Sequence, residues 1–135
     1  MHRLSVRPQF QAVLAGKTLV RTPHFAMHVL APPSGEAIQE QAGFDSLFSQ
    51  SGVWMGAMVP KRWAKRAVTR NTIKRQIYSV SADFESTLQP IVHLVRLRST
   101  FDRSRFVSAT SDALKAAVRS ELQQLFAMAG SKGTP

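Results

Sequence analysis

The sequence has no cysteine and few acidic residues, and each shortage limits what the chain can be. Without Cys it has neither disulfides nor thiolate metal ligands, which agrees with a reducing compartment. Its eight Asp and Glu residues are scattered, so they do not supply the clustered oxygen ligands that a two-metal nuclease needs. No apolar run approaches the roughly 20 residues that span a bilayer, and the N-terminus lacks an apolar segment of signal-peptide length. We therefore expect a cytoplasmic protein that does not bind membranes.

Positive charge is what the chain has in excess. The 135 residues include 18 Lys and Arg, which gives a formal net charge of +10 and a pI near 11.4. Lys and Arg that neutralise phosphates release condensed counterions, so a polyanion is the expected partner and nucleic acid the first candidate. The length suits a single domain over residues 1–135.

The charge is concentrated in the stretch Lys61–Arg75, KRWAKRAVTRNTIKR, and no acidic residue occurs between Asp45 and Asp83. A helix that begins near residue 67 would have two unlike sides, because each residue turns it by 100°. Its apolar stripe comprises Ile73, Ile77, Val80 and Phe84. The opposite side gathers Asn71, Lys74, Arg75 and Tyr78. One side would pack against the rest of the protein, and the other would be free to bind an anion. The competing interpretation is a basic, solvent-facing helix without a dedicated partner.

These residues resemble the signature helix of the bacterial ribonuclease P protein family, the small basic subunit of the RNA enzyme that removes 5′ leaders from precursor tRNA. The family pattern has a basic pair at the end of a strand, a short basic turn, Ala, then Arg-Asn and Lys-Arg. The matching residues here are Lys61, Arg62, Lys65, Arg66, Ala67, Arg70, Asn71, Lys74 and Arg75. The chain departs from the pattern at Thr72, where a second Arg is usual, and at Tyr78 and Ser79, where an Arg-Glu pair is common.

The remaining elements follow from periodicity and from turn residues. Residues 8–16 read PQFQAVLAG and predict a short helix, with Pro near the start and Gly past the end. Alternation predicts a strand at 24–31, and apolar runs predict strands at 53–59 and 90–97. Residues 32–52 are rich in Pro, Gly, Ser and Gln and predict a long inserted loop, in which Phe44, Leu47 and Phe48 could form a helical turn.

The end of the chain predicts a second long helix. Leu114, Val118, Leu122 and Leu125 have helical spacing, with a cap at Thr110 or Ser111 and an end at Gly130. A basic loop at 98–105 precedes this helix, and a frayed tail at 131–135 follows it. The order is helix, strand, strand, helix, strand, helix, and for this order the family resemblance implies an α/β (α+β) two-layer sandwich. The resemblance, which runs from about Arg3 to Leu125, adds a possible extra short strand near the connection and a left-handed β-α-β crossover, against the general rule.

The resemblance also implies which residues bind RNA. Contacts to the catalytic RNA are expected from Lys61, Arg62, Lys65, Arg66, Arg70, Asn71, Lys74 and Arg75. A cleft for the single-stranded 5′ leader is expected at Phe10, Leu14, Ala26, His28 and Tyr78. His28 would stack on a base, as aromatic rings commonly do with single-stranded RNA. Core packing is an equal alternative for Phe10 and Leu14, and Trp63 either stacks on a nucleotide or fixes the basic turn.

By the same resemblance, phosphodiester hydrolysis belongs to the RNA and its Mg²⁺ ions. The chain then acts as the accessory subunit of an endoribonuclease, with no catalytic residue and no bound cofactor or metal. Its partners are the catalytic RNA and precursor tRNA, and no obligate protein partner is expected. His24 and His28 would share one face of a strand, but a third metal ligand is not near in sequence. Asp83 and Glu85 are more simply solvated or charge-balancing groups.

Two other classes of protein fit part of the sequence. A ribosomal or assembly protein could have the same size and charge, although the Arg-Asn and Lys-Arg helix after a strand does not generally mark that class. A self-sufficient nuclease would need metal ligands or a nucleophile and base, and it would cut RNA without an RNA partner.

Overall fold

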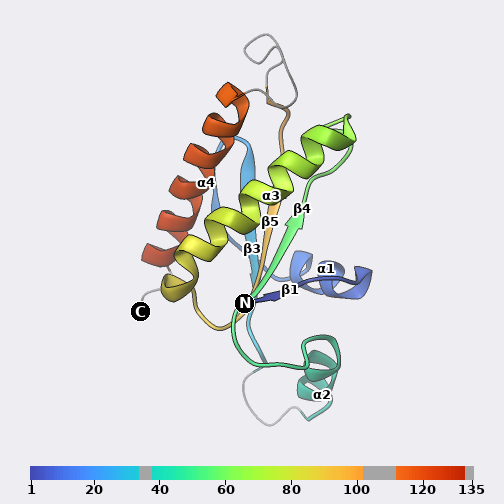
Figure 1. The fold of residues 1–135 in the computed structure, drawn as a ribbon. Helices are drawn as coiled ribbons and strands as arrows, with labels where there is room; N and C mark the ends of the chain where they lie inside the picture. Colours follow the sequence, from blue (N-terminus) through green and yellow to red (C-terminus); the bar gives the residue numbers. More distant parts are fainter. Residues whose placement is uncertain (34–37, 102–111, 133–135) are drawn as a thin grey trace.

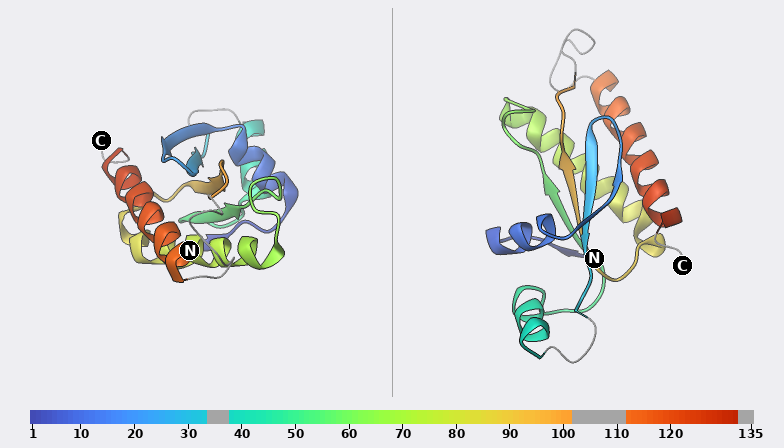
Figure 2. Two further views of the ribbon diagram at one scale, coloured as in Figure 1. Left: turned by 90° about the horizontal axis from the view of Figure 1, so that it is seen from above. Right: turned by 180° about the vertical axis from the view of Figure 1, so that it is seen from behind.

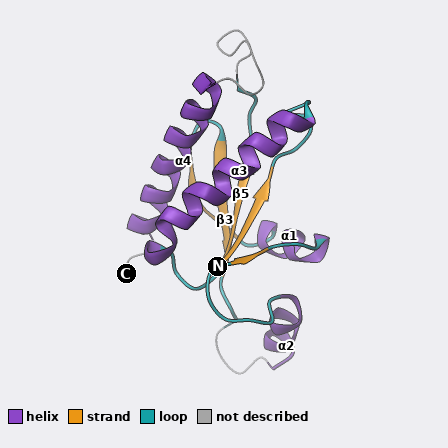
Figure 3. Ribbon diagram, in the orientation of Figure 1, coloured by secondary structure: helices purple, strands orange, loops and turns teal. Residues whose placement is uncertain are grey.

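The structure is a computed structural model that describes residues 1–33, 38–101 and 112–132. Its centre is one five-stranded sheet with the order β1-β4-β5-β3-β2 (Figure 1). The strands are β1 (His2–Arg3), β2 (Lys17–Arg21), β3 (Phe25–Leu30), β4 (Trp54–Met58) and β5 (Val92–Leu97). The helices, purple in Figure 3, are α1 (Arg7–Leu14), α2 (Ile38–Leu47), α3 (Ala67–Phe84) and α4 (Asp112–Lys132), with a 3₁₀ turn at Glu85–Thr87.

The connection between the two central parallel strands has the unusual hand. β4 pairs in parallel with both β1 and β5, whereas β3 is antiparallel to β2 and β5. In Figure 1, β4 and β5 run upward behind α3, and β5 lies to the left of β4. The β4-α3-β5 crossover is therefore left-handed, as the family resemblance predicted and against the common preference.

The alternation of β3 divides the molecule into two cores. Phe25, Met27 and Val29 point to the face that α3 and α4 cover, where they join Ile73, Ile77, Val118 and Leu122 in the larger cluster. Ala26 and His28 point to the other face, because successive side chains of a strand alternate. There α1 lies across the sheet (Figure 2), and Val13 packs with Val92 and Leu94 in the smaller cluster.

The predicted phase of α3 is confirmed. Ile73, Ile77 and Val80 are at most 1% exposed. Phe84 is half-buried against the same core, and its ring stacks on Phe126 of α4 with centroids 5.8 Å apart. The apolar stripe of the basic helix therefore fixes which side chains remain on its outer side.

Four elements differ from those predicted from the sequence. Neither β2 nor β1 was predicted as a strand. β2 has five residues and follows α1 directly, and β1 has only two residues. Residues 32–52 contain the ten-residue helix α2, which is longer than the single turn expected there. Gly130 does not end α4, which continues to Lys132; an added Cβ at Gly130 would approach nothing closer than 3.6 Å. The predicted caps Thr110 and Ser111 lie outside the described residues, as does the second half of the basic loop, residues 102–105.

Contacts at both ends fix the position of α1. Gly16 approaches β3 so closely that an added Cβ would lie 2.4 Å from the carbonyl oxygen of Val29. The buried amide of Gln9 accepts hydrogen bonds from the backbone N–H groups of Ser5 (2.7 Å) and Val6 (3.2 Å) and donates one to the carbonyl of Leu47 (2.8 Å). These bonds tie the entry of α1 to the end of α2, so the position of α1 is set from both ends.

Candidate nucleic-acid interface

The basic turn between β4 and α3 is held by packing and by backbone contacts. Trp63 is half-buried against the larger core, with the guanidinium of Arg62 centred 5.1 Å from its ring. The indole N–H of Trp63 is buried and has no hydrogen-bond partner among the described residues. The N–H of Ala64 donates to the carbonyl of Pro60 at 3.2 Å, which closes the turn. Trp63 therefore fixes the turn; stacking on a nucleotide stays a prediction.

Arg70 reinforces this turn from inside α3. Its Nη1 donates to the carbonyl oxygens of Ala64 (3.0 Å) and Lys65 (2.8 Å), so part of its guanidinium is already engaged. Arg70 and Lys74 are half-buried, whereas the other predicted RNA-binding residues are exposed. The exposed group comprises Lys61, Arg62, Lys65, Arg66, Asn71 and Arg75. The turn and the outer side of α3 thus form one basic surface, and its contacts with RNA stay a prediction.

Thr72 does not belong to that surface. It is 7% exposed, and its hydroxyl donates to the carbonyl of Val68 at 2.8 Å. This position, one of those at which the chain departs from the family pattern, therefore points into the protein.

A second basic group, which the sequence analysis did not predict, lies on the sheet face that carries α1. Arg96 of β5 is paired with Ala26 of β3 and Met58 of β4 in the sheet. Burial lowers the pKa of Arg96, and the positive charges of Arg62, Arg98 and Arg21 lower it further. We call these four residues the arginine cluster. Among the described residues none of the four forms an ion pair with a carboxylate.

The arginine cluster is costly, because like charges repel and, in the part of the chain that the structure describes, none of the four guanidinium groups is paired with a carboxylate. Such arrangements occur at sites that bind an anion. One sequence feature indicated it: Arg96 is the single charged residue in the apolar strand VHLVRL. The approach of Arg21 and Arg62 to it depends on the sheet order, which the sequence did not specify.

His28 lies under this cluster, and its hydrogen bonds define its tautomer. Arg96 Nε can only donate, so His28 Nε2 accepts at 3.2 Å and Nδ1 carries the proton toward Thr18 Oγ1 at 3.1 Å. Burial, followed by the charges of Arg96 and Arg21, lowers the pKa of His28 and favours this neutral form. The side chain is 7% exposed, so little of the ring is available to stack on a base. The geometry instead favours His28 as the residue that orients Arg96.

The other predicted leader residues do not all lie together. Phe10 and Leu14 are half-buried on α1 and pack against the smaller core, and Ala26 is fully buried beside Arg96. Tyr78 packs against the larger core, on the opposite side of the sheet. The prediction that Tyr78 lines the same cleft as His28 is wrong, because α3 covers the face away from α1.

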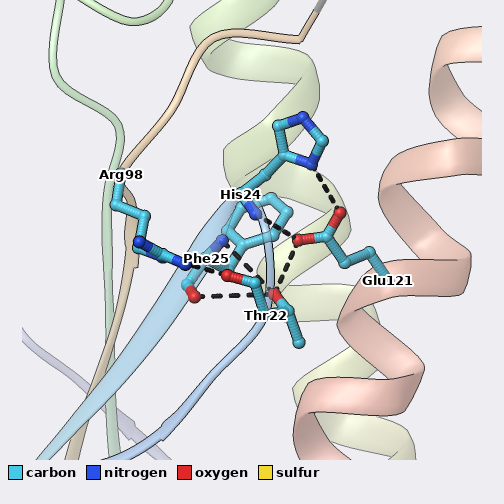
Figure 4. A network of polar contacts seen from close by, with 5 residues as sticks. All are labelled: Thr22, His24, Phe25, Arg98 and Glu121. Atoms are coloured by element: carbon cyan, nitrogen blue, oxygen red, sulfur yellow. Dashed lines mark hydrogen bonds and ion pairs between the residues drawn. The ribbon is translucent and has the colours of Figure 1, made fainter.

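His24 also departs from its predicted place. It precedes β3, so the alternation of the strand does not reach it, and it contacts α4 instead. Glu121 accepts hydrogen bonds from the hydroxyl of Thr22 (2.6 Å) and from the backbone N–H of His24 (2.7 Å), and its other oxygen lies 2.7 Å from His24 Nδ1 (Figure 4). Arg98 Nε donates to the carbonyl of Thr22 at 2.9 Å. This network joins α4 to the β2-β3 turn and orients one member of the arginine cluster.

Comparison with known proteins identifies the family. The family model described as Ribonuclease P matches residues 1–128. The chain belongs to the ribonuclease P protein family. The ribonuclease P protein component of Ralstonia pickettii is 32% identical over 127 residues, which cover 94% of this chain and 78% of that protein. The corresponding component of Bordetella petrii is 30% identical over 129 residues, covering 94% of this chain and 88% of that one.

Solved structures in the family have the same fold. The structure of the Staphylococcus aureus RNase P protein at 2.0 Å aligns with a TM-score of 0.65 and 17% identity, over 96% of this chain and 95% of that one. A mutant of the S. aureus protein with defective mRNA degradation activity aligns with a TM-score of 0.63, also at 17% identity, over 95% of this chain and 87% of that chain. Membership places the chain among proteins of tRNA processing that bind RNA.

Two features are absent from the described residues. None of their helices is long and apolar enough to cross a membrane. Likewise, the side chains described bring no three His, Asp or Glu residues together as a metal site would require.

Proposed function

We propose that the protein is the subunit of ribonuclease P that binds the catalytic RNA and the 5′ leader of precursor tRNA in the cytoplasm. The family match over residues 1–128 carries this proposal. The role of the protein chain itself is to bind these RNAs. Hydrolysis of the phosphodiester bond is assigned to the RNA subunit and its Mg²⁺ ions, and the protein binds no cofactor of its own.

The basic turn and the outer side of α3 are the proposed contact with the catalytic RNA. Six of the eight predicted residues there are exposed: Lys61, Arg62, Lys65, Arg66, Asn71 and Arg75. Lys and Arg on this surface would bind phosphates and release counterions, which gives affinity without base specificity. The buried stripe of α3 supports this role, because it holds the basic side in a fixed orientation.

The arginine cluster beside α1 is the proposed contact with the leader. Arg96 lies on the sheet between Ala26 and Met58, and its guanidinium is oriented by His28. A single-stranded leader would meet a positive surface for its phosphates, with the half-buried Phe10 and Leu14 of α1 beside it. In this arrangement, arginine contacts to the leader phosphates replace the base stacking expected at His28.

Reconstitution tests the proposal directly. Cleavage of precursor tRNA is measured with the cognate ribonuclease P RNA alone, with the protein alone, and with both, at one fixed Mg²⁺ concentration. We expect no cleavage by the protein alone, and tighter binding of precursor tRNA when the protein joins the RNA. Metal-dependent cleavage by the protein alone, or no effect of the protein on the RNA's substrate binding, would overturn the proposed function.

A further inference from the structure

Arg3 and Tyr78 meet at the edge of the sheet although they lie far apart in the sequence. Arg3 belongs to β1, the edge strand beside β4, and Tyr78 belongs to α3. The Cζ atom of Arg3 lies 4.0 Å from the centroid of the Tyr78 ring, well within the range of a cation–π contact. Tyr78 is half-buried against the larger core, whereas Arg3 is exposed. The ring is thus a fixed support that orients an exposed guanidinium.

The Tyr78 ring lies on the same side of α3 as two basic residues of that helix. Arg70, Lys74 and Tyr78 follow one another at intervals of four residues, so they occupy one side of the helix at successive turns, about 6 Å apart. Tyr78 carries no charge itself, but the guanidinium above its ring does. Arg3 therefore adds a third positive charge to the row that Arg70 and Lys74 begin.

No acidic group accounts for the position of Arg3. Among the described residues none forms an ion pair with it, and Asp83, five residues beyond Tyr78, pairs with Arg119 of α4 at 3.1 Å. Charged side chains also occur on edge strands simply to keep them soluble. The contact with Tyr78 favours a more specific role, because it turns the guanidinium toward the basic side of α3.

We propose that Arg3 is an RNA-contacting residue of the α3 surface, positioned by the Tyr78 ring to bind the phosphate next to those bound by Arg70 and Lys74. The proposal rests on the proposed function and extends it to a residue outside the basic helix. Tyr78 acts through Arg3, so it is a positioning residue, and its ring matters while its hydroxyl does not.

The test compares the salt dependence of binding to the cognate ribonuclease P RNA, at constant Mg²⁺. Arg3→Ala should reduce the slope of log affinity against log salt by about 0.7 to 0.9, the value for one lost phosphate contact. Lys115→Ala is the matched control: Lys115 is exposed on α4, and its loss changes the net charge equally. We expect Lys115→Ala to keep the parent slope. Tyr78→Phe should also keep it, because the ring remains.

A double-mutant cycle separates positioning from packing. In a Tyr78→Leu background, which removes the ring but keeps an apolar side chain, Arg3→Ala should reduce affinity less than it does in the parent. An unchanged slope for Arg3→Ala, or an equal loss in Lys115→Ala, would overturn the proposal while the proposed function stands. Equal effects of Arg3→Ala in both backgrounds would exclude the role of Tyr78. A parent protein that does not bind the RNA would remove the proposed function itself.

Discussion

The two faces of the sheet differ in what covers them, although the same strands build both. α3 and α4 have 18 and 21 residues, or about 27 and 32 Å of helix, enough to cover one face. α1 has eight residues, or about 12 Å, and cannot cover five strands spaced about 4.8 Å apart. The covered face is apolar, and the partly covered face carries Arg96. The length of the helices thus decides where the sheet can present charge.

The largest loss of stability is expected from a substitution on the covered face. Ile77 is fully buried, so Ile77→Ala should lower the free energy of unfolding by about 2 to 5 kcal/mol. Arg75→Ala, on the exposed side of the same helix, should stay within about 0.5 kcal/mol and weaken RNA binding instead. Denaturant unfolding of both variants measures the difference. A neutral Ile77→Ala would contradict the orientation of α3.

A smaller loss is expected where α4 meets the β2-β3 turn. Glu121→Ala leaves the hydroxyl of Thr22 and the N–H of His24 without their acceptor, which should cost about 1 to 3 kcal/mol. Asp83→Ala is the control, since its pair with Arg119 is exposed and should contribute at most about 1 kcal/mol. Thermal melts of the two variants test this ranking. Equal losses of stability in the two variants would contradict it.

Much of the covered face could be predicted from the sequence, and little of the charged face. The spacing of Ile73, Ile77 and Val80 defined the phase of α3, because a helical stripe is a local pattern. The alternation of β3 placed Met27 and His28 on opposite faces for the same reason. Apart from Arg96, whose charge stands out in an apolar strand, the arginine cluster could not be predicted, because it joins β2, the basic turn and β5 through pairings remote in sequence. The contact of Glu121 with the segment before β3 likewise depends on how α4 docks.

Acid should destabilise the fold through two histidines. Burial lowers the pKa of His93, as burial and the charges of Arg96 and Arg21 lower that of His28, from an ordinary value of 6.5. The unfolded chain therefore binds protons at a higher pH than the folded chain does. The contribution of the two neutral histidines to the free energy of unfolding is therefore fully present above about pH 6.5, and it is lost progressively below that pH.

Melting temperatures between about pH 7.5 and about pH 5 measure this effect. His28→Gln retains an acceptor for Arg96 and should flatten the pH dependence, as should His93→Gln. The slopes of melting temperature against pH are compared, because either substitution can also change the stability at neutral pH. If both variants keep the parent's slope, other groups govern the response to acid.

The affinity of the reconstituted complex for precursor and mature tRNA tests the central claim most directly. We expect the parent complex to prefer the precursor, because only the precursor has a leader to meet the arginine cluster. Arg96→Ala should narrow that preference and leave binding of the catalytic RNA intact, whereas Lys115→Ala should change neither. Equal affinity of the parent complex for the two tRNAs would contradict the assignment of this face to the leader.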